Sequence, residues 1–362
     1  MKNNLLLCCL LLCACGAPAD PPASNASAQP GFAGLGGQGS GFASVTPGRP
    51  LVFPRDHGAH PDYRIEWWYV TANLTDASGQ HYGVQWTLFR SALAPGADQP
   101  GWSNGNLWLG HAGLTTATAQ HAEQRVSRGG IGQAGVDPAP WRAWIDNWSL
   151  SATAPAGDPL QNLRVQAQGK DFGYNLQLHT QQPLVLQGEQ GYSRKSDQGQ
   201  ASWYYSQPFL KAHGDLQIDG RTVPVEGTAW LDREWSSQYM AANQQGWDWF
   251  SLHLEDGRQL MLFRLRHADG QPYVSGTWIE ADGSTEPLSA ADIDLQPLTT
   301  TTIDGHRVPT QWSLKIPRKG LDIRTHALND KSWMALATPY WEGPISFAGS
   351  QQGGGYLEMT GY

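Results

Sequence analysis

Two segments of the sequence place carboxylates directly beside tryptophan. Glu66 precedes two tryptophans in HPDYRIEWWYV (60–70), and the run DREW at 232–235 contains Asp232 and Glu234. Burial among large apolar rings raises the pKa of a carboxylic acid, so that it can hold a proton near neutral pH and donate it to a substrate. We therefore predict acid–base chemistry, with these three carboxylates as candidate catalytic groups.

Arginine neighbours act in the opposite direction, because a guanidinium lowers the pKa of a carboxyl group and forms a bidentate pair with it. On strict alternation along a strand, Arg64 and Glu66 share one face, whereas Arg233 and Glu234 lie on opposite faces. We expect Glu66 to be paired with an arginine, as a barrel-closing or rim residue. Glu234 is expected to be free, and Arg233 to stabilise charge on a substrate.

Signatures of the common enzyme classes are absent from the sequence. It contains no Gly-x-Ser-x-Gly, no His-Glu-x-x-His, no phosphate loop and no dinucleotide fingerprint. His57 and His60 have a spacing that could serve a metal, but they stand in a Gly/Pro-containing segment with no third ligand nearby. We expect a hydrogen-bonded loop there, and neither a metal nor a cofactor.

The segments that would position these residues alternate in hydrophobicity with a period of two. Residues 67–74 and 84–90 show the pattern clearly, and turn signals such as Asp-Ala-Ser-Gly, Glu-Asp-Gly, Ala-Asp-Gly and Ile-Asp-Gly separate such runs. No stretch sustains a helical period. The sequence therefore predicts an all-β chain of antiparallel strands and hairpins, arranged as a barrel or sandwich.

A weak internal repeat predicts two similar barrels. A tryptophan, an aromatic residue two positions on, and then Leu-x-Asp occur at 67–76 and again at 247–256. Each is followed by Leu-Phe-Arg, at 88–90 and 262–264. The alternative is that tryptophan-rich hairpins resemble one another without duplication.

The length of 362 residues is sufficient for two domains. We expect an N-terminal domain at 51–225 and a C-terminal domain at 226–362, with the boundary just after a hairpin at 216–220. The net charge of -8 gives no electrostatic reason to expect a nucleic-acid partner.

The first fifteen residues have the layout of a secretory signal, with one lysine before an apolar run that is too short to span a bilayer. The end of this run, LCAC, resembles a bacterial lipobox, in which Cys15 takes a lipid and becomes the first mature residue. Gly16 follows instead of the aspartate that retains such proteins at the inner membrane. We expect a lipoprotein of the bacterial cell envelope that faces the periplasm, on the outer membrane; an ordinary secreted protein is the alternative.

Residues 16–50 are rich in Gly, Ala, Pro and Ser, which predicts a flexible tether. All four cysteines lie within the first fifteen residues, so the remaining chain must fold without disulfides.

Seventeen tryptophans can either line a large apolar cavity or fill a barrel as a dense plug, and the sequence leaves both readings open. A lined cavity would bind a hydrophobic small molecule. Two pairs, Trp67 with Arg90 and Trp247 with Arg264, are expected to close the barrel floors by stacking guanidinium on indole. The candidate lining residues are Trp67, Tyr69, Trp86, His111, Trp235, Trp247, Trp249 and Trp341.

Four separated motifs, at 53–70, 227–235, 340–343 and 355–362, resemble the AttH-like proteins, which belong with the carotenoid 1,2-hydratases. The resemblance runs from about residue 50 to the last residue and implies two lipocalin-like domains in one chain. Secreted members are often described as predicted hydrolases. Other members are linked with ABC-transporter operons, which implies transporter subunits as partners of a lipid-tethered protein.

The hydratases protonate an isolated double bond and add water. Their Asp-His-Asn-Trp segment is matched by DREW at 232–235, where arginine replaces the histidine. Residues 260–265 (LMLFRL), which correspond to their Tyr-x-Asp, contain no acid. The resemblance therefore predicts a hydrolase-like or hydratase-like enzyme that acts on a hydrophobic substrate other than a carotenoid. The alternative is a lipoprotein that binds a lipid or small hydrophobic ligand without catalysis.

Overall fold

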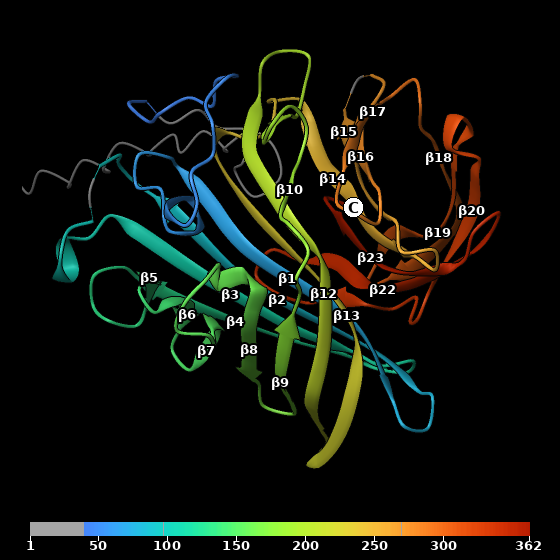
Figure 1. Cartoon of the computed structure of the whole chain (residues 1–362), viewed down its shortest axis with the longest axis horizontal. Helices are drawn as coiled ribbons and strands as arrows, with labels where there is room; N and C mark the ends of the chain where they lie inside the picture. The colour runs from blue at the N-terminus through green and yellow to red at the C-terminus, as the bar shows by residue number, and fades with distance from the viewer. Residues whose placement is uncertain (1–39, 97, 269) are drawn as a thin grey trace, which may run out of the picture.

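The computed structural model describes residues 40–96, 98–268 and 270–362. These form two lobes of antiparallel sheet, one coloured blue to yellow and the other orange to red in Figure 1. Cys15 and residues 16–39 of the predicted tether lie outside the described residues. Nowhere in the described ranges is there a helix with the length and hydrophobicity needed to cross a membrane. Helical structure there consists of the 3-10 turns η2 (Arg55–His57), η3 (Gly101–Ser103), η4 (Pro159–Gln161) and η5 (Pro317–Lys319).

The first lobe is a curled thirteen-stranded sheet in the order β4-β3-β2-β1-β13-β12-β9-β8-β7-β6-β5, with β10 and β11 paired to β12. β3 and β4 also contact β6, near the opposite edge, so the sheet bends into a barrel. Its strands are β1 (Ile65–Asp76), β2 (His81–Ala92), β3 (Asn106–Thr115), β4 (Gln120–Arg128), β5 (Ala134–Pro138), β6 (Trp141–Ile145), β7 (Trp148–Ala152), β8 (Asn162–Gln168), β9 (Phe172–His179), β10 (Val185–Leu186), β11 (Tyr192–Arg194), β12 (Ala201–Ile218) and β13 (Arg221–Gln238).

The second lobe is a ten-stranded sheet in the order β17-β16-β15-β14-β23-β22-β20-β19-β18, with β21 paired to β22. Both sheets are antiparallel throughout, which confirms the predicted all-β, lipocalin-like architecture. The strands are β14 (Gln244–Leu254), β15 (Gln259–His267), β16 (Tyr273–Ile279), β17 (Thr285–Ser289), β18 (Asp294–Ile303), β19 (His306–Ile316), β20 (Leu321–Ala327), β21 (Trp333–Met334), β22 (Tyr340–Gly349) and β23 (Gly353–Thr360).

The Asp-Gly turn signals mark real hairpins. Ile218 pairs with Arg221, and Ile303 pairs with His306, so each turn contains only an aspartate and a glycine. Asp219 and Asp304 both have positive φ angles, near 50°, which a two-residue type I′ turn requires and which aspartate tolerates better than most residues.

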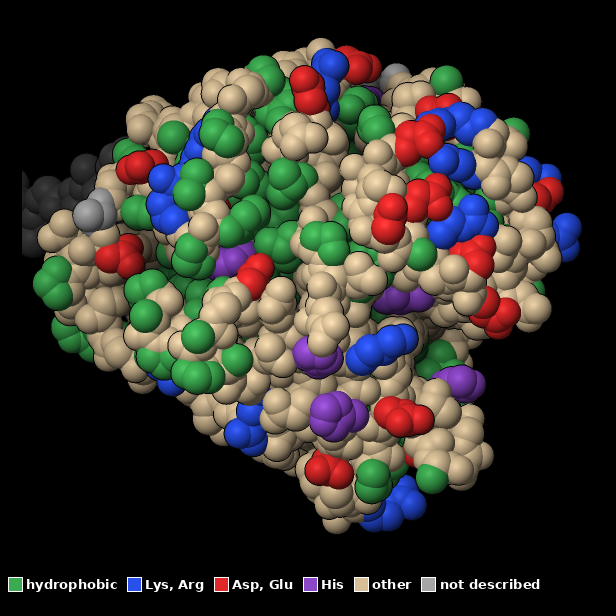
Figure 2. All heavy atoms as spheres, viewed as in Figure 1, with side chains coloured by type: hydrophobic (Ala, Val, Ile, Leu, Met, Phe, Trp, Pro, Cys, Tyr) green, Lys and Arg blue, Asp and Glu red, His purple; other side chains and the backbone are tan. Residues whose placement is uncertain are grey.

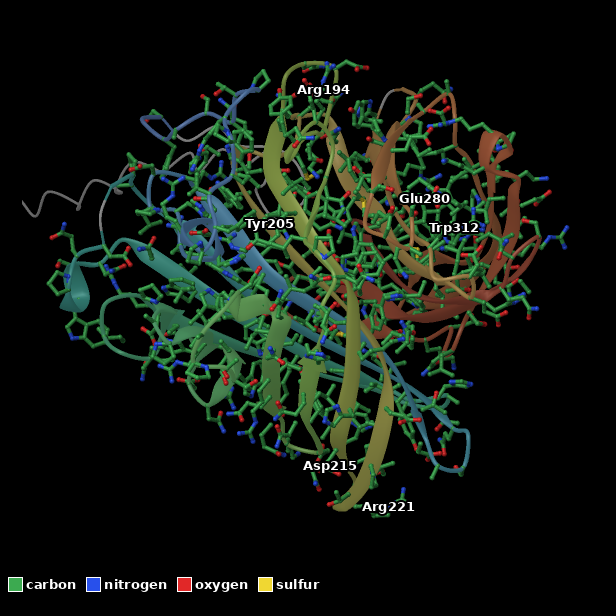
Figure 3. All side chains as sticks on the ribbon, in the orientation of Figure 1. Arg194, Tyr205, Asp215, Arg221, Glu280 and Trp312 are labelled. Atoms are coloured by element: carbon green, nitrogen blue, oxygen red, sulfur yellow. The ribbon has the colours of Figure 1, made fainter. Side chains whose placement is uncertain are left out.

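Side-chain alternation fills both barrels. In β1, Trp68, Val70 and Ala72 point into the first barrel, where they join a continuous buried cluster. Phe250 and Leu252 of β14 do the same in the second barrel, together with residues such as Trp312, which lies within the second lobe in Figure 3. The two barrel interiors are therefore packed cores. Of the two readings of the tryptophan count, a lined cavity or a dense plug, the barrel interiors follow the second.

The alternate residues of the same strands pack between the lobes. Tyr69, Tyr204 and Trp230 of the first sheet meet Trp249 and Phe263 of the second in a third buried cluster. β1 contacts β23 and β2 contacts β22, so the outer faces of the two sheets lie against each other. This interface positions the candidate site.

The change of sheet comes later than the predicted boundary near residue 225. β13 pairs with β1 from residue 225 to residue 236 and belongs to the first sheet up to Gln238. The second sheet begins at Gln244. The turn at 216–220 joins two strands of one sheet, and Asp215 and Arg221 mark this hairpin where it extends away from both lobes in Figure 3.

Candidate active site between the two sheets

A cavity with a volume of about 100 Å³ lies between the lobes. Trp67 and Tyr69 of β1 line it, as do Trp247 and Trp249 of β14. These are the equivalent positions of the sequence repeat, and the rings of Tyr69 and Trp249 meet edge to face with centroids 5.3 Å apart. Four of the predicted lining residues thus share one cavity, which belongs to neither barrel interior.

Asp232 of β13 lies in this cavity and is almost fully buried. Its carboxyl group accepts hydrogen bonds from the Tyr204 hydroxyl (2.6 Å), the Ser206 hydroxyl (2.5 Å) and the Trp230 indole N–H (2.7 Å). Burial raises the pKa of Asp232 to about 7, although the three hydrogen bonds oppose the rise. Asp232 can therefore hold or release a proton near neutral pH.

Glu234, two residues on, faces the same cavity. The Lys195 ammonium lies 2.7 Å from its carboxylate, and Ser202 donates a hydrogen bond to the same oxygen. The expectation that Glu234 is free was wrong, because Lys195 comes from the turn after β11 and is distant in sequence. In Figure 3, the adjacent Arg194 marks this turn at the top of the molecule.

Burial raises the pKa of Glu234, and the Lys195 ammonium offsets part of that rise. Lys195 is itself buried, which lowers its own pKa. The ammonium also lies over the rings of Tyr204, Tyr239 and Phe263, at 4.3 to 5.1 Å from their centroids. The pair therefore places a buried cation and a hydrogen-bonded carboxylate beside Asp232.

Two further carboxylates come from the second sheet, where Glu342 of β22 lies directly opposite Glu358 of β23. Glu358 lines the cavity and accepts a 3.1 Å hydrogen bond from the Trp247 indole N–H; burial raises its pKa to about 8. Glu342 accepts a hydrogen bond from the Tyr69 hydroxyl, and burial together with the neighbouring Glu358 raises its pKa well above the ordinary range.

The sequence prediction missed Glu342, Glu358 and Lys195. An acid between Leu357 and Met359 in an alternating strand was a usable signal for Glu358, because such an acid must face the opposite side from its apolar neighbours. No comparable signal existed for Lys195, whose position depends on a turn conformation.

Glu66 belongs to the floor of the first barrel. Glu66 is paired with arginine, as expected, but the partners come from other strands than the same-face Arg64 on which the expectation was based. Arg90 of β2 and Arg233 of β13 both donate to its carboxylate, and the His60 backbone N–H donates at 2.9 Å. The two guanidinium groups hold the pKa of Glu66 well below its usual range although burial opposes them. Glu66 borders the cavity but is fully buried and doubly paired, which suits a structural role.

Arg233 faces the barrel interior, away from the substrate side to which it was assigned. Its guanidinium stacks 3.8 Å from the Trp68 ring centroid and 5.0 Å from that of Trp235, and it is completely buried. The predicted opposite orientation of Arg233 and Glu234 is confirmed, since Glu234 lines the cavity. That orientation leaves Lys195, not Arg233, as the cation beside the acids.

The predicted floor stacks have different partners. Arg90 donates to Asn106 (2.8 Å) and to two backbone carbonyls in addition to Glu66. In the second barrel Arg264 lies 4.6 Å from the ring centroid of Trp312 and pairs with Asp248, a counterpart of the Glu66 cluster.

The other predicted lining residues lie elsewhere. Trp86 and Trp235 are in the first core, and Trp341 is in the second. His111 is buried behind the cavity wall, with Nδ1 at 3.0 Å from the Tyr340 hydroxyl, and burial lowers its pKa to about 4.

The loop with His57 and His60 is hydrogen-bonded, as predicted. His57 Nδ1 lies 2.8 Å from the Tyr205 hydroxyl, and the His60 ring stacks on Trp235 with centroids 3.9 Å apart. Tyr205 belongs to the first core and is labelled within the first lobe in Figure 3. The loop therefore seals the end of the first barrel.

Fold and site together define a two-barrel all-β protein with a cluster of buried acids between its barrels. The chain belongs to the AttH-like family, whose model matches residues 44–362. A Nitrosomonas europaea protein assigned as AttH has 34% sequence identity to this chain and a TM-score of 0.77, and the match covers 89% of this chain and all of that one.

Two other solved structures share the fold. Kievitone hydratase from Nectria haematococca has 18% identity and a TM-score of 0.65 over 89% of this chain and 97% of its own. CghA, determined with Sch210972, has 12% identity and a TM-score of 0.52 over 90% of this chain and 97% of its own. No curated protein sequence matches the chain.

Proposed function

We propose that the protein is an acid–base enzyme that adds water to a carbon–carbon double bond of a mainly apolar substrate. One observation carries this proposal: Asp232, with a pKa raised to about 7, faces an aromatic-walled cavity between the sheets. A neutral carboxylic acid in such a site is a proton donor at physiological pH.

The chemistry balances without a further reactant. The Asp232 carboxyl group transfers its proton to one alkene carbon, and the π bond breaks, leaving a carbocation on the other carbon. The rings of Trp249 and Phe263, which line the cavity, stabilise this cation. Water adds to the cation and loses a proton to the Glu234 carboxylate, from which the proton returns to Asp232.

Lys195 keeps Glu234 available as a base, since its ammonium favours the carboxylate. The tyrosines that border the site, such as Tyr204, have pKa values raised well above 10 by burial and remain neutral donors. Kievitone hydratase, which shares the fold, is by its name a hydratase; this supports the reaction class as an analogy. A hydrolase reaction that uses the same acid and base is the nearest variant.

A second candidate is a non-catalytic carrier of a lipid or small hydrophobic ligand. The observation that favours it is the aromatic wall of the cavity, in which the carboxyl group of Glu358 is kept neutral near pH 7 by burial. Such a wall suits an apolar guest whether or not it reacts.

We also propose that the protein is tethered to the cell envelope by a lipid on Cys15, facing the periplasm. The lipobox-like LCAC run supports this. An accessory role beside an ABC transporter remains a prediction from the family resemblance.

Incubation with isoprenoid alkenes (geraniol, farnesol and squalene) in ¹⁸O-labelled water tests the reaction. Mass spectrometry should detect a product that has gained one labelled water, formed by the parent protein and lost in Asp232→Asn. The carrier alternative predicts binding of the alkenes without label incorporation in either protein.

A further inference from the structure

The outer face of the first sheet carries an apolar row that runs from the candidate site to the edge of the sheet. Residues paired in register on neighbouring strands lie side by side on one face. The register aligns, from β13 to β4, Glu234, Trp67, Phe89, Leu109 and Val126. Glu234 is buried, the next three are half-buried, and Val126 is 57% exposed. Beyond Glu234 the row contains no polar side chain.

The exposed end of the row is part of a wider apolar surface. Leu107, diagonal to Val126 across β3 and β4, is 46% exposed. The loop between β2 and β3 adds Leu93 and Trp102, which are 78% and 72% exposed. The Leu93 N–H donates to the Gly105 carbonyl (2.9 Å), which extends the β2–β3 ladder and places Leu93 next to Leu107. We call Leu93, Trp102, Leu107 and Val126 the edge patch.

The edge patch stands out from the rest of the described surface. Its four members are among only six large hydrophobic residues that are exposed in the described part of the chain. In Figure 1 the teal turn η3, which contains Trp102, lies at the left margin of the first lobe, and Figure 2 shows acidic and basic side chains intermixed over the second lobe. Apolar residues gathered in this way usually mark an interaction surface.

The described chain begins beside this patch. A methyl carbon placed on Gly41 would lie 3.5 Å from Cγ of Pro95, in the same β2–β3 loop as Leu93 and Trp102. The Ala43 N–H donates to the Asp62 carbonyl (2.9 Å), which fixes the start of the chain to the body. The preceding segment, which contains Cys15, therefore enters the described body next to the loop that carries Leu93 and Trp102.

We propose that the edge patch lies on the surface of a lipid bilayer, and that the apolar row leads membrane-dissolved substrate from it into the cavity. Leucine and tryptophan suit the boundary between headgroups and acyl chains. The substrate route rests on the proposed function, whereas the bilayer contact does not depend on catalysis.

Site-directed spin labelling of the full chain tests the contact, because the sequence has no cysteine after residue 15. Ser103→Cys places a label beside Trp102 and keeps that side chain, and Thr300→Cys places a control label on exposed β18 of the second lobe. The unsubstituted protein, labelled in parallel, gives the background. Each protein is added to vesicles of phosphatidylethanolamine and phosphatidylglycerol, and collision with oxygen and with an aqueous nickel chelate is measured by electron paramagnetic resonance.

The label at 103 is expected to collide more with oxygen, which concentrates in the bilayer, than with the nickel chelate, and the label at 300 should show the reverse. Adding Leu93→Ser and Trp102→Ser should return the 103 label to the aqueous pattern, whereas the matched Leu298→Ser should not. An aqueous pattern at 103, absence of vesicle association, or a label shielded from both agents by a second protein copy would overturn the proposal.

The docking variants also separate this proposal from the proposed function. Turnover of dissolved geraniol should be unchanged by Leu93→Ser with Trp102→Ser, because neither residue lines the cavity. Asp232→Asn should lose turnover while the label at 103 keeps its pattern of collisions. That variant therefore tests the proposed catalysis and not the bilayer contact.

Discussion

The hydroxyl of Tyr204 donates a 2.6 Å hydrogen bond to Oδ2 of Asp232, between the neighbouring strands β12 and β13. The oxygen of the same hydroxyl accepts a 3.1 Å hydrogen bond from the Trp249 indole N–H of the second sheet. The candidate acid of the first lobe is thus oriented by a residue that the second lobe holds in place. The site exists only where the two lobes meet.

Asp232→Asn should abolish turnover and leave the fold intact. Asparagine can keep Oδ1 as acceptor for Trp230 and Ser206, but its amide has no acidic proton to transfer. Turnover should fall by at least ~100-fold, with an unchanged circular dichroism spectrum. Retained turnover in the variant would move the acid role elsewhere, with Glu358 as the next candidate.

The same carboxyl group should make stability depend on pH. Its pKa is raised from 3.8 to about 7, so the folded protein binds this proton more tightly than the unfolded chain does. The contribution is fully present below about pH 4 and is lost as pH rises through 7.

As the pH rises from about 4 to above 7, the free energy of unfolding of the parent protein should fall, relative to that of Asp232→Asn, by an amount on the order of 4 kcal/mol. Urea unfolding of both proteins at several pH values measures the difference. Parallel stability curves would show that Asp232 has an ordinary pKa.

Lys195→Met should shift the acid limb of the pH–rate profile more than the alkaline limb. Without the ammonium, burial alone acts on Glu234 and its pKa rises further, so that the base form requires higher pH. The acid limb of the pH–rate profile should move toward higher pH, and Lys195→Arg should restore it in part. If Lys195→Met left the pH–rate profile unchanged, Glu234 would be excluded as the base.

Glu66→Gln should destabilise the fold strongly, because it leaves the buried guanidinium groups of Arg90 and Arg233 without their carboxylate. Breaking a buried pair in this way costs about 3–5 kcal/mol. Asp137→Asn, which breaks the exposed pair with Arg142, is the matched control and should change urea unfolding little. Equal effects of the two substitutions would argue against the barrel-floor role of Glu66.

Trp249→Leu should weaken binding of the apolar probe N-phenyl-1-naphthylamine by about tenfold, since it removes part of the cavity wall worth roughly 1.5 kcal/mol of burial. Trp102→Leu, outside the cavity, is the control for fluorescence titration. Undiminished affinity in Trp249→Leu would place the probe outside this cavity.

Much of the fold could be predicted from alternation and turns. The Asp-Gly hairpins at 219–220 and 304–305 and the two faces of β1 were legible because period-two hydrophobicity and positive-φ turns are local properties. The residue at which the first sheet ends could not be predicted, because the sequence of a long strand such as β13 does not indicate which sheet the strand belongs to.

The candidate site was only partly predictable. Asp232 and Glu234 were found from their tryptophan context, and their shared face follows from their spacing. The salt bridge from Lys195 and the arginine pairs of Glu66 join residues that are distant in sequence. Strand pairing places Arg90 opposite Glu66, and the turn after β11 places Lys195 beside Glu234. The location of the cavity between the barrels likewise depends on how two complete sheets pack, which alternation does not specify.

Infrared difference spectroscopy of the protonation state of Asp232 tests the central claim most directly. The parent protein minus Asp232→Asn should show the C=O stretch of a protonated carboxylic acid at pH 5, which disappears with a midpoint near pH 7. A carboxylate signal throughout this range would contradict the assignment of Asp232 as the acid.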